Sequence, residues 1–270
     1  DNTEDDDFLD KIKIVRPLIV GFQVFSVNYP KFCYLIPRVR RICPETKIIA
    51  GGPHVSGLPE QTLIDNPDLD FVVRGEAEEA LKLLVLSLLQ KSLNSTIKSI
   101  PNLVYRTDNG IIMNKIESVD VNKYGAPAWE MLEPDKYPAT QHGTFHKSNK
   151  VVPIITSRGC PHPCTYCAGH LLTGKTIRRR DISSIVDEIE FLQSSYGFKE
   201  FIIEDENFTF YKDHVISLSN EIKKRNIKCY FSFPNGVRLD KLDEEIIHHL
   251  KQMGTYMVHL GIESGSKKTL

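Results

Sequence analysis

The sequence of 270 residues has no apolar run long enough to cross a bilayer. Its most apolar stretch, residues 81–89, is far shorter than the roughly 20 residues that a transmembrane helix needs. Nothing at its start resembles a secretory signal peptide. We therefore expect no membrane span and a cytoplasmic protein.

Neither an excess of charge nor an excess of cysteine is present. The 34 basic residues balance the 35 acidic ones, which gives no electrostatic reason to expect nucleic acid or an anionic membrane as a partner. Six cysteines in 270 residues are too few for a secreted disulfide scaffold. The length is compatible with two domains.

Three of the cysteines, however, stand close together. Cys160, Cys164 and Cys167 have the spacing C-x3-C-x2-C and follow an apolar run at residues 151–155. Three thiolates can hold three irons of a [4Fe–4S] cluster, whereas electron-transfer ferredoxins use four cysteines per cluster. The next cysteine along the chain is Cys229. The pattern therefore predicts a cluster with one open iron, where a small molecule binds and reacts.

Zinc is the alternative that this pattern leaves open. His162 or His170 could supply a fourth ligand to the three sulfurs. Structural zinc sites usually have a second pair of cysteines or histidines farther along, and no such pair follows here. The cluster is the favoured interpretation.

The first hundred residues alternate between strand and helix patterns. Apolar runs at 18–25, 47–50 and 71–73 predict strands, with helical patterns between and after them. This alternation predicts a parallel, doubly wound sheet, in which ligands bind beyond the carboxyl ends of the strands. Two of those ends carry the turns Gly51-Gly52-Pro53-His54 and Gly75-Glu76.

A connector is expected at residues 101–150. Within it, residues 102–114 predict a β-hairpin with Asn109-Gly110 at the turn. The later part is rich in turn residues and aromatics, and we expect Trp129 to pack there rather than to contact a substrate.

From residue 151 onward the pattern is that of a partial barrel. Strands predicted at 151–156, 200–203, 229–233 and 256–260 alternate with three helices. In β/α barrels the active site lies at the carboxyl ends of the strands. The polar residues at those ends include Asp205, Glu206, Ser232, Asn235, Arg238 and Glu263.

Two parts of the sequence resemble a known family. The cysteine motif, with Tyr166 just before its last cysteine, is similar to the signature of radical S-adenosylmethionine (SAM) enzymes. The segments Val-Gly-Phe … Val-Asn-Tyr-Pro, Ile-Ile-Ala-Gly-Gly-Pro-His and Val-Val-Arg-Gly-Glu-Ala-Glu-Glu, within residues 18–80, resemble the cobalamin-binding domain of one subgroup.

The resemblance implies a fold and a division of the chain. We expect an incomplete doubly wound, flavodoxin-like cobalamin-binding domain at residues 1–100, without the family's first strand. The connector at 101–150 would lead to the N-terminal part of a (β/α)6 radical SAM barrel at 151–270. The chain would then be truncated at both ends and would be a fragment of a longer protein.

The resemblance also implies cofactor contacts. Cys160, Cys164 and Cys167 would hold the [4Fe–4S] cluster. The expected SAM contacts are Tyr166, Asp205, Glu206, Ser232, Arg238 and Glu263. The expected cobalamin contacts are Gly51, Gly52, His54, Gly75 and Glu76.

This chain departs from the family in its cobalamin region. The D-x-H-x-x-G loop that some members use to ligate cobalt has no counterpart, and Gln23 stands where many members carry serine near the corrinoid tail. His54 is interpreted as a turn residue facing the pocket rather than as a cobalt ligand.

The implied activity is reductive cleavage of SAM to a 5′-deoxyadenosyl radical, in a cobalamin-dependent methyltransferase or, as a second option, in ring-forming radical chemistry. The implied partners are a small-molecule or natural-product substrate and a reductant such as flavodoxin or ferredoxin. Two other classes stay open: a non-catalytic iron–sulfur or corrinoid carrier, and a zinc-stabilised binding module.

Overall fold

The structure, a computed structural model, describes residues 3–137 and 145–269. The chain forms two compact units. The first unit comprises Asp1–Val119 and Pro163–Gly174, and the second comprises Asp120–His162 and Lys175–Leu270. Among the described residues, no helix has the length and apolar character needed to cross a membrane.

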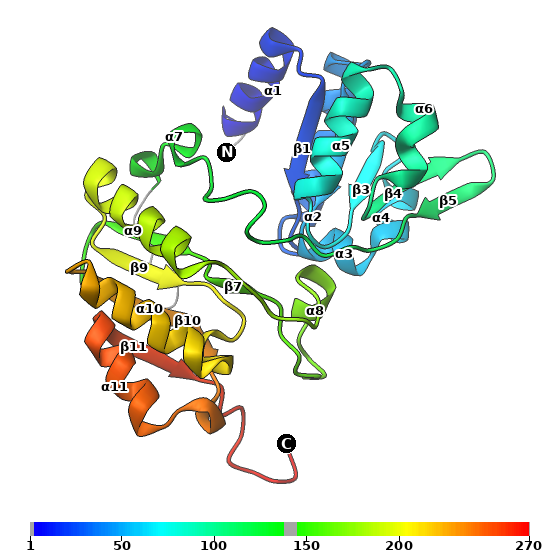
Figure 1. The fold of residues 1–270 in the computed structure, drawn as a ribbon. Helices are drawn as coiled ribbons and strands as arrows, with labels where there is room; N and C mark the ends of the chain where they lie inside the picture. The colour runs from blue at the N-terminus through cyan, green and yellow to red at the C-terminus, as the bar shows by residue number, and fades with distance from the viewer. Residues whose placement is uncertain (1–2, 138–144, 270) are drawn as a thin grey trace. The chain divides into compact units, whose positions relative to one another are not determined.

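The first unit is built on a five-stranded sheet in the order β1-β2-β3-β4-β5 (Figure 1). The first three strands are parallel: β1 (Ile19–Gln23), β2 (Lys47–Gly51) and β3 (Phe71–Val73). Strands β4 (Leu103–Thr107) and β5 (Gly110–Met113) form the hairpin that the sequence predicts. The hairpin adds to β3 in antiparallel fashion, a pairing that the sequence did not indicate.

Helices cover both faces of this sheet. Successive side chains of a strand point to opposite faces, and in β2 the side chains on both faces are apolar and buried. Ile48 and Ala50 pack in one core with residues of α1 (Thr3–Val15), α2 (Tyr29–Ile42), α3 (Pro53–Gly57) and α4 (Pro59–Asp65). Ile49, between them, packs in a second core with α5 (Glu78–Leu89). Two short elements follow α5, namely α6 (Leu93–Thr96) and η1 (Ile97–Ser99). This arrangement confirms the predicted doubly wound class.

One local prediction in the first unit was wrong. Residues 51–54 were expected to form a plain turn, but helix α3 begins at Pro53. Gly52, with a φ of 101°, precedes it, and the fixed φ of proline suits the first position of a helix.

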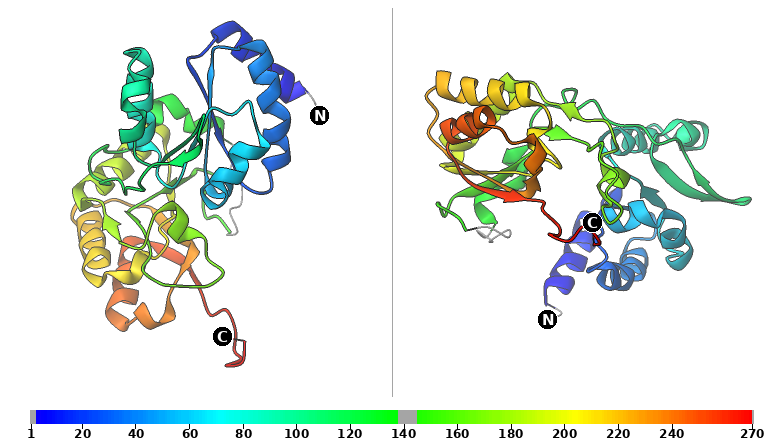
Figure 2. Two further views of the ribbon diagram at one scale, coloured as in Figure 1. Left: turned by 90° about the vertical axis from the view of Figure 1, so that its right-hand side faces the viewer. Right: turned by 90° about the horizontal axis from the view of Figure 1, so that it is seen from below.

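The second unit contains a parallel four-stranded sheet in the order β11-β10-β9-β6. Its strands are β6 (Val151–Ile154), β9 (Glu200–Ile203), β10 (Tyr230–Val237) and β11 (Thr255–Leu260). Helices α9 (Ile182–Tyr196), α10 (Lys212–Lys224) and α11 (Glu244–Met253) lie on one side of it, as both views of Figure 2 show. A parallel sheet with helices on one face is part of a β/α barrel, as predicted.

The remaining elements of the second unit are short. They are α7 (Trp129–Leu132), η2 (Pro134–Lys136), η3 (Phe208–Phe210) and η4 (Leu239–Lys241), with a two-stranded antiparallel pair, β7 (Ser157–Arg158) and β8 (Arg178–Arg179). Between β7 and β8 the chain carries the three cysteines and the helix α8 (Gly169–Leu172), which belongs to the first unit.

Candidate functional site

The three cysteines lie in a long loop between β7 and β8. Ser157 pairs with Arg179 and Arg158 with Arg178, so the two ends of this loop are held side by side at its base. Gly159 follows β7 with a φ of +100°, and a Cβ on it would lie 2.3 Å from the carbonyl oxygen of Thr176. Only glycine combines that φ with so close an approach of the two chain segments.

Asp205, which follows β9, holds the end of β6 next to this base. Its carboxylate accepts hydrogen bonds from Thr156 N, Thr156 Oγ1 and Ser157 Oγ, each at 2.6 Å. The side chain is buried, and burial raises the pKa of Asp205 to about 6, although the hydrogen bonds act in the opposite direction. The carboxylate therefore braces the segment that leads to the cysteines.

His214 of α10 contacts the same threonine. Its Nε2 lies 3.1 Å from Thr156 Oγ1. Burial, followed by the nearby Arg179, lowers the pKa of His214 to about 4, so the imidazole is neutral at neutral pH. Nothing in the sequence pattern distinguished His214 from an ordinary residue of a helix face.

Glu206 reaches the base of the loop on the cysteine side. Its Oε2 accepts a hydrogen bond of 3.0 Å from the backbone N–H of Gly159, the residue before Cys160. Two of the three acidic residues expected to contact SAM, Asp205 and Glu206, thus contact the backbone on either side of β7. Their contact with SAM stays a prediction.

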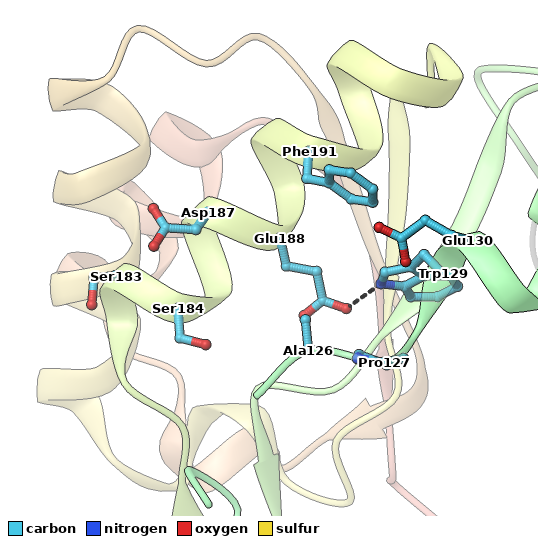
Figure 3. Close-up of a pocket in the computed structure, with 9 residues that line it drawn as sticks. All are labelled: Ala126, Pro127, Trp129, Glu130, Ser183, Ser184, Asp187, Glu188 and Phe191. Atoms are coloured by element: carbon cyan, nitrogen blue, oxygen red, sulfur yellow. Dashed lines mark hydrogen bonds between the residues drawn. The ribbon is translucent and has the colours of Figure 1, made fainter. Parts of the chain in front are cut away.

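A buried ion pair holds the other side of β6. Arg180 and Glu188 lie 2.6 Å apart, and Arg180 also donates to the carbonyl oxygen of Ile155 at 2.8 Å. Figure 3 shows Trp129 donating its indole N–H to Glu188, at 2.8 Å, beside a pocket of about 360 Å³ between α7 and α9. Trp129 is buried in the core of the second unit, where packing is its evident role.

The cysteines themselves differ in exposure. Cys160 and Cys164 are half-buried, Cys167 is exposed, and all six cysteines of the chain, which lie within the described ranges, are outside disulfide bonds. The N–H of Cys167 donates to the carbonyl of Cys164 at 3.1 Å, and the N–H of Gly169 donates to Cys167 Sγ at 3.3 Å.

The donor set suits an iron–sulfur cluster, because closely spaced thiolates are soft ligands that favour such clusters or zinc. Across residues 3–137 and 145–269, no three His, Cys, Asp or Glu side chains are arranged to hold a metal ion. Ligation by the three cysteines is thus a prediction from their spacing. Of the two histidines proposed as a fourth zinc ligand, His170 lies in α8. The ring of His162 packs edge-on against Phe210, with ring centroids 5.8 Å apart, and burial lowers its pKa.

Of the remaining SAM candidates, Arg238 and Glu263 follow β10 and β11, whereas Ser232 lies inside β10, which runs to Val237 rather than ending at 233 as expected. Ser232 is fully buried, whereas Glu263 is exposed with a φ of +59°. Arg238 makes two hydrogen bonds to Asp240, of 2.9 and 3.1 Å, and Asn235 donates to Glu204. Exposed Tyr166 belongs to the first unit with Cys167. Their roles toward SAM stay predictions.

Asn207 is a residue that the sequence did not single out. It follows Glu206, is 4% exposed, and neither atom of its amide group has a hydrogen-bond partner in the described part of the chain. A buried amide without partners is costly, so a polar ligand that reaches Asn207 would remove that cost.

In the first unit, the cobalamin candidates lie at the carboxyl ends of β2 and β3. A Cβ on Gly52 would lie 2.9 Å from the carbonyl oxygen of Val24, so this glycine permits a close backbone approach within the protein. His54 contacts Ser26 Oγ at 3.0 Å and stacks on Tyr29, with ring centroids 4.1 Å apart. His54 therefore sits where helix α3 begins, held by two neighbours.

The other cobalamin candidates also have protein contacts. A Cβ on Gly51 would lie 3.8 Å from the Val73 carbonyl oxygen. Gly75 donates its N–H to Ser56 Oγ at 3.0 Å, and buried Glu76 accepts from the N–H of Val119 at 2.8 Å. Their contact with cobalamin stays a prediction.

Two family models match the chain. Residues 1–85 match the B12 binding domain, and residues 154–270 match the radical SAM superfamily. The chain belongs to the radical SAM superfamily, in the group with a B12-binding domain. The resemblance drawn from the sequence is confirmed.

Individual proteins similar to this radical SAM chain include an uncharacterized methyltransferase, PH0819, from Pyrococcus horikoshii, with 32% identity over 99% of the chain and 57% of the relative. Cytidylyl-2-hydroxyethylphosphonate methyltransferase from Streptomyces wedmorensis is 27% identical over 98% of the chain and 54% of the relative. The chain thus spans little more than half the length of these two relatives.

A solved structure has the same fold. The radical SAM methyltransferase TsrM from Kitasatospora setae, with cobalamin and a [4Fe–4S] cluster bound, has a TM-score of 0.74 and 20% identity, covering 96% of this chain and 52% of TsrM. A partial barrel and a doubly wound sheet of this kind therefore also occur within one chain in a solved structure.

Proposed function

We propose that this chain is the part of a cobalamin-dependent radical SAM enzyme that binds the [4Fe–4S] cluster and SAM, and that the enzyme is a methyltransferase. The observation that carries the proposal is the C-x3-C-x2-C segment emerging at the carboxyl end of β6 in a partial β/α barrel. The similarity to two named methyltransferases supports the reaction class.

Cys160, Cys164 and Cys167 would hold the cluster, which when bound and reduced would supply the electron for cleavage of SAM to a 5′-deoxyadenosyl radical. The protein's part is to place the thiolates and to orient SAM. Asp205 and Glu206 contribute by fixing the backbone around β7.

We assign SAM to the strand ends of the barrel. Arg238 and Glu263 are charged groups suited to the carboxylate and the ribose of SAM, respectively. Buried Asn207 is a further candidate because its amide has no partner in the described protein. Tyr166 and Ser232 complete the set with Asp205 and Glu206.

We assign cobalamin to residues 1–100, at Gly51, Gly52, His54, Gly75 and Glu76, with residues 101–150 as a connector and 151–270 as the first part of the barrel. We further propose a small-molecule or natural-product substrate, a flavodoxin or ferredoxin as reductant, and a cytoplasmic location, where the cluster would be kept reduced.

The test is anaerobic reconstitution with iron and sulfide, followed by EPR of the dithionite-reduced protein with and without SAM. We expect a [4Fe–4S] signal that changes when SAM is added, together with release of 5′-deoxyadenosine. Replacing all three cysteines by alanine should abolish the signal.

The other two function classes predict different results. A non-catalytic carrier would bind a cluster whose signal is indifferent to SAM. A zinc-stabilised module would contain zinc without acid-labile sulfide. Either result would contradict the proposed function.

A further inference from the structure

Helix α8, which begins two residues after Cys167, packs on the first unit beside α3 (Figure 1). Leu171 Cδ1 lies 4.0 Å from the position of a Cβ on Gly57. The carbonyl oxygen of Leu172 would lie only 3.0 Å from a Cβ on Gly75, and that of Leu171 would lie 3.5 Å away. The end of α8 therefore occupies the space where any other residue at position 75 would carry its side chain.

Hydrogen bonds to α3 and to Val119 hold Gly75 and Glu76 in place. Gly75 has a φ of +66°, which favours glycine, and its N–H donates to Ser56 Oγ in α3 at 3.0 Å. The next residue, Glu76, is buried and accepts from Val119 N. A seat formed by Gly57 of α3 and by Gly75 therefore lies beyond the carboxyl ends of β2 and β3.

The chain after α8 passes close to the same turn. A Cβ on Gly174 would lie 3.5 Å from Ser118 Oγ, and Ser118 immediately precedes Val119, whose N–H donates to Glu76. The segment 169–174 therefore runs beside residues that are linked to the Gly75-Glu76 turn.

The same segment is connected to two of the cysteines by short hydrogen-bonded links. Gly169, the first residue of α8, donates its N–H to Cys167 Sγ at 3.3 Å. Cys167 in turn donates its N–H to the carbonyl of Cys164 at 3.1 Å. Movement of α8 would displace both sulfur-bearing residues.

We propose that Gly75 is a positioning residue for Cys164 and Cys167: it provides the seat on which α8 docks, and α8 holds the two cysteines. This role differs from contact with the corrinoid, which the resemblance implies for Gly75. The inference rests on the proposed cluster for its functional consequence, but the docking of α8 can be tested without any cluster.

The experiment compares Gly75→Ala with Gly125→Ala in the chain without metal and after reconstitution. Gly125 is a matched control because its φ of +69° imposes the same backbone strain, while nothing lies within 4 Å of its Cβ position. The first readout is hydrogen exchange at Leu171 and Thr173, whose N–H groups donate to the carbonyl oxygens of Ala168 and Gly169 and so close the single turn of α8. The second is the iron bound per chain.

In Gly75→Ala we expect these two amides to exchange roughly tenfold faster, because the added methyl group displaces α8. The iron content should fall to less than about half that of the unchanged chain, since two of three ligands are misplaced. Gly125→Ala should leave both readouts unchanged. Leu171→Ala removes the side chain that α8 places beside Gly57, the other part of the seat, and leaves Gly75 unchanged. It should show the same two effects, each smaller than in Gly75→Ala.

Unchanged exchange in Gly75→Ala would contradict the docking of α8 on Gly75. Faster exchange with normal iron content would contradict the role of that docking in positioning the cysteines. Weaker cobalamin binding with both readouts unchanged would show that Gly75 serves the corrinoid alone, which also overturns the proposal. If the unchanged chain takes up no iron, the proposed function fails, while the exchange measurement still decides whether α8 docks on Gly75.

Discussion

At the scale of single residues, Asp205 and His214 share the hydroxyl group of Thr156, and burial displaces their pKa values in opposite directions. Buried Asp205 retains its proton to about pH 6, whereas His214 is neutral above about pH 4. The three side chains connect the chain after β6 and the chain after β9 with α10. Such a network sets the position of the backbone that leads to Cys160.

Asp205→Asn should reveal the pH dependence of this network. The folded-state pKa of Asp205 is raised from 3.8 to about 6, so its contribution to stability is fully present below pH 4 and is lost as the pH rises through 6. The change corresponds to about 3 kcal/mol. Asparagine keeps an oxygen that can accept from Thr156 N, but it has no proton to lose and stays uncharged at every pH. We therefore expect the unfolding free energy of the unchanged protein, relative to Asp205→Asn, to fall by about this amount between pH 4 and pH 7.

Asp213→Asn is the matched control for this measurement. Asp213 is largely exposed, and its hydrogen bond to Arg179 lowers its pKa, so its contribution is present at neutral pH and is lost as the pH falls. The difference between the unchanged protein and Asp213→Asn should therefore have the opposite slope. Chemical denaturation at a series of pH values gives both differences, and the same slope for both variants would contradict this account of Asp205.

At the scale of elements, a hydrogen bond from Trp129 to Glu188 links helix α7 to α9. Trp129→Phe keeps an aromatic ring in the core but removes the indole N–H, which leaves a buried carboxylate oxygen without that donor. We expect a loss of about 1–3 kcal/mol in unfolding free energy, because an unsatisfied buried acceptor carries its full desolvation cost. Glu130→Gln, on the same helix, changes a group outside this bond and should cost far less. Equal losses in the two variants would show that the hydrogen bond is unimportant.

The sequence predicted elements better than it predicted contacts. The strands β1–β3 and the hairpin β4–β5 follow from apolar runs and the Asn109-Gly110 turn, which are local signals. The pairing of β4 with β3 is not local, and no pattern in residues 103–107 specifies which sheet edge the hairpin joins. Helix α3 was missed because a Gly-Gly-Pro turn and a proline-initiated helix begin with the same residues.

The candidate site shows the same limit more sharply. The spacing of Cys160, Cys164 and Cys167 identifies the chemistry, because ligand type and number are written in the sequence. The contacts of Asp205 with Thr156 and Ser157 join residues about fifty positions apart, and the acidic run at 204–206 looks the same whether it faces a ligand or the backbone. His214 and Gly159 acquire their roles only from packing.

At the scale of the whole molecule, each unit has hydrophobic cores of its own. Among the residues that the structure describes, the second unit has one cluster around α9, α10 and the four-stranded sheet, and the first has two clusters on opposite faces of its sheet. None of these clusters contains buried residues from both units. Because stability is contributed mainly by burial within each cluster, local stability should respond to core substitutions unit by unit.

Leu192→Ala and Leu84→Ala test this independence as a matched pair. Both leucines are fully buried in helices, Leu192 in the second unit and Leu84 in the first, so each substitution should cost about 2–5 kcal/mol in its own core. Native-state hydrogen exchange should show reduced protection of β9 and β10 in Leu192→Ala, with β2 and β3 unchanged, and the reverse in Leu84→Ala. If either substitution lowered protection equally in both sheets, the two units would unfold as one cooperative body. In that case a core substitution remote from the cysteines would alter the Gly75 seat and the Asp205 brace together, and the two contacts could not be tested separately.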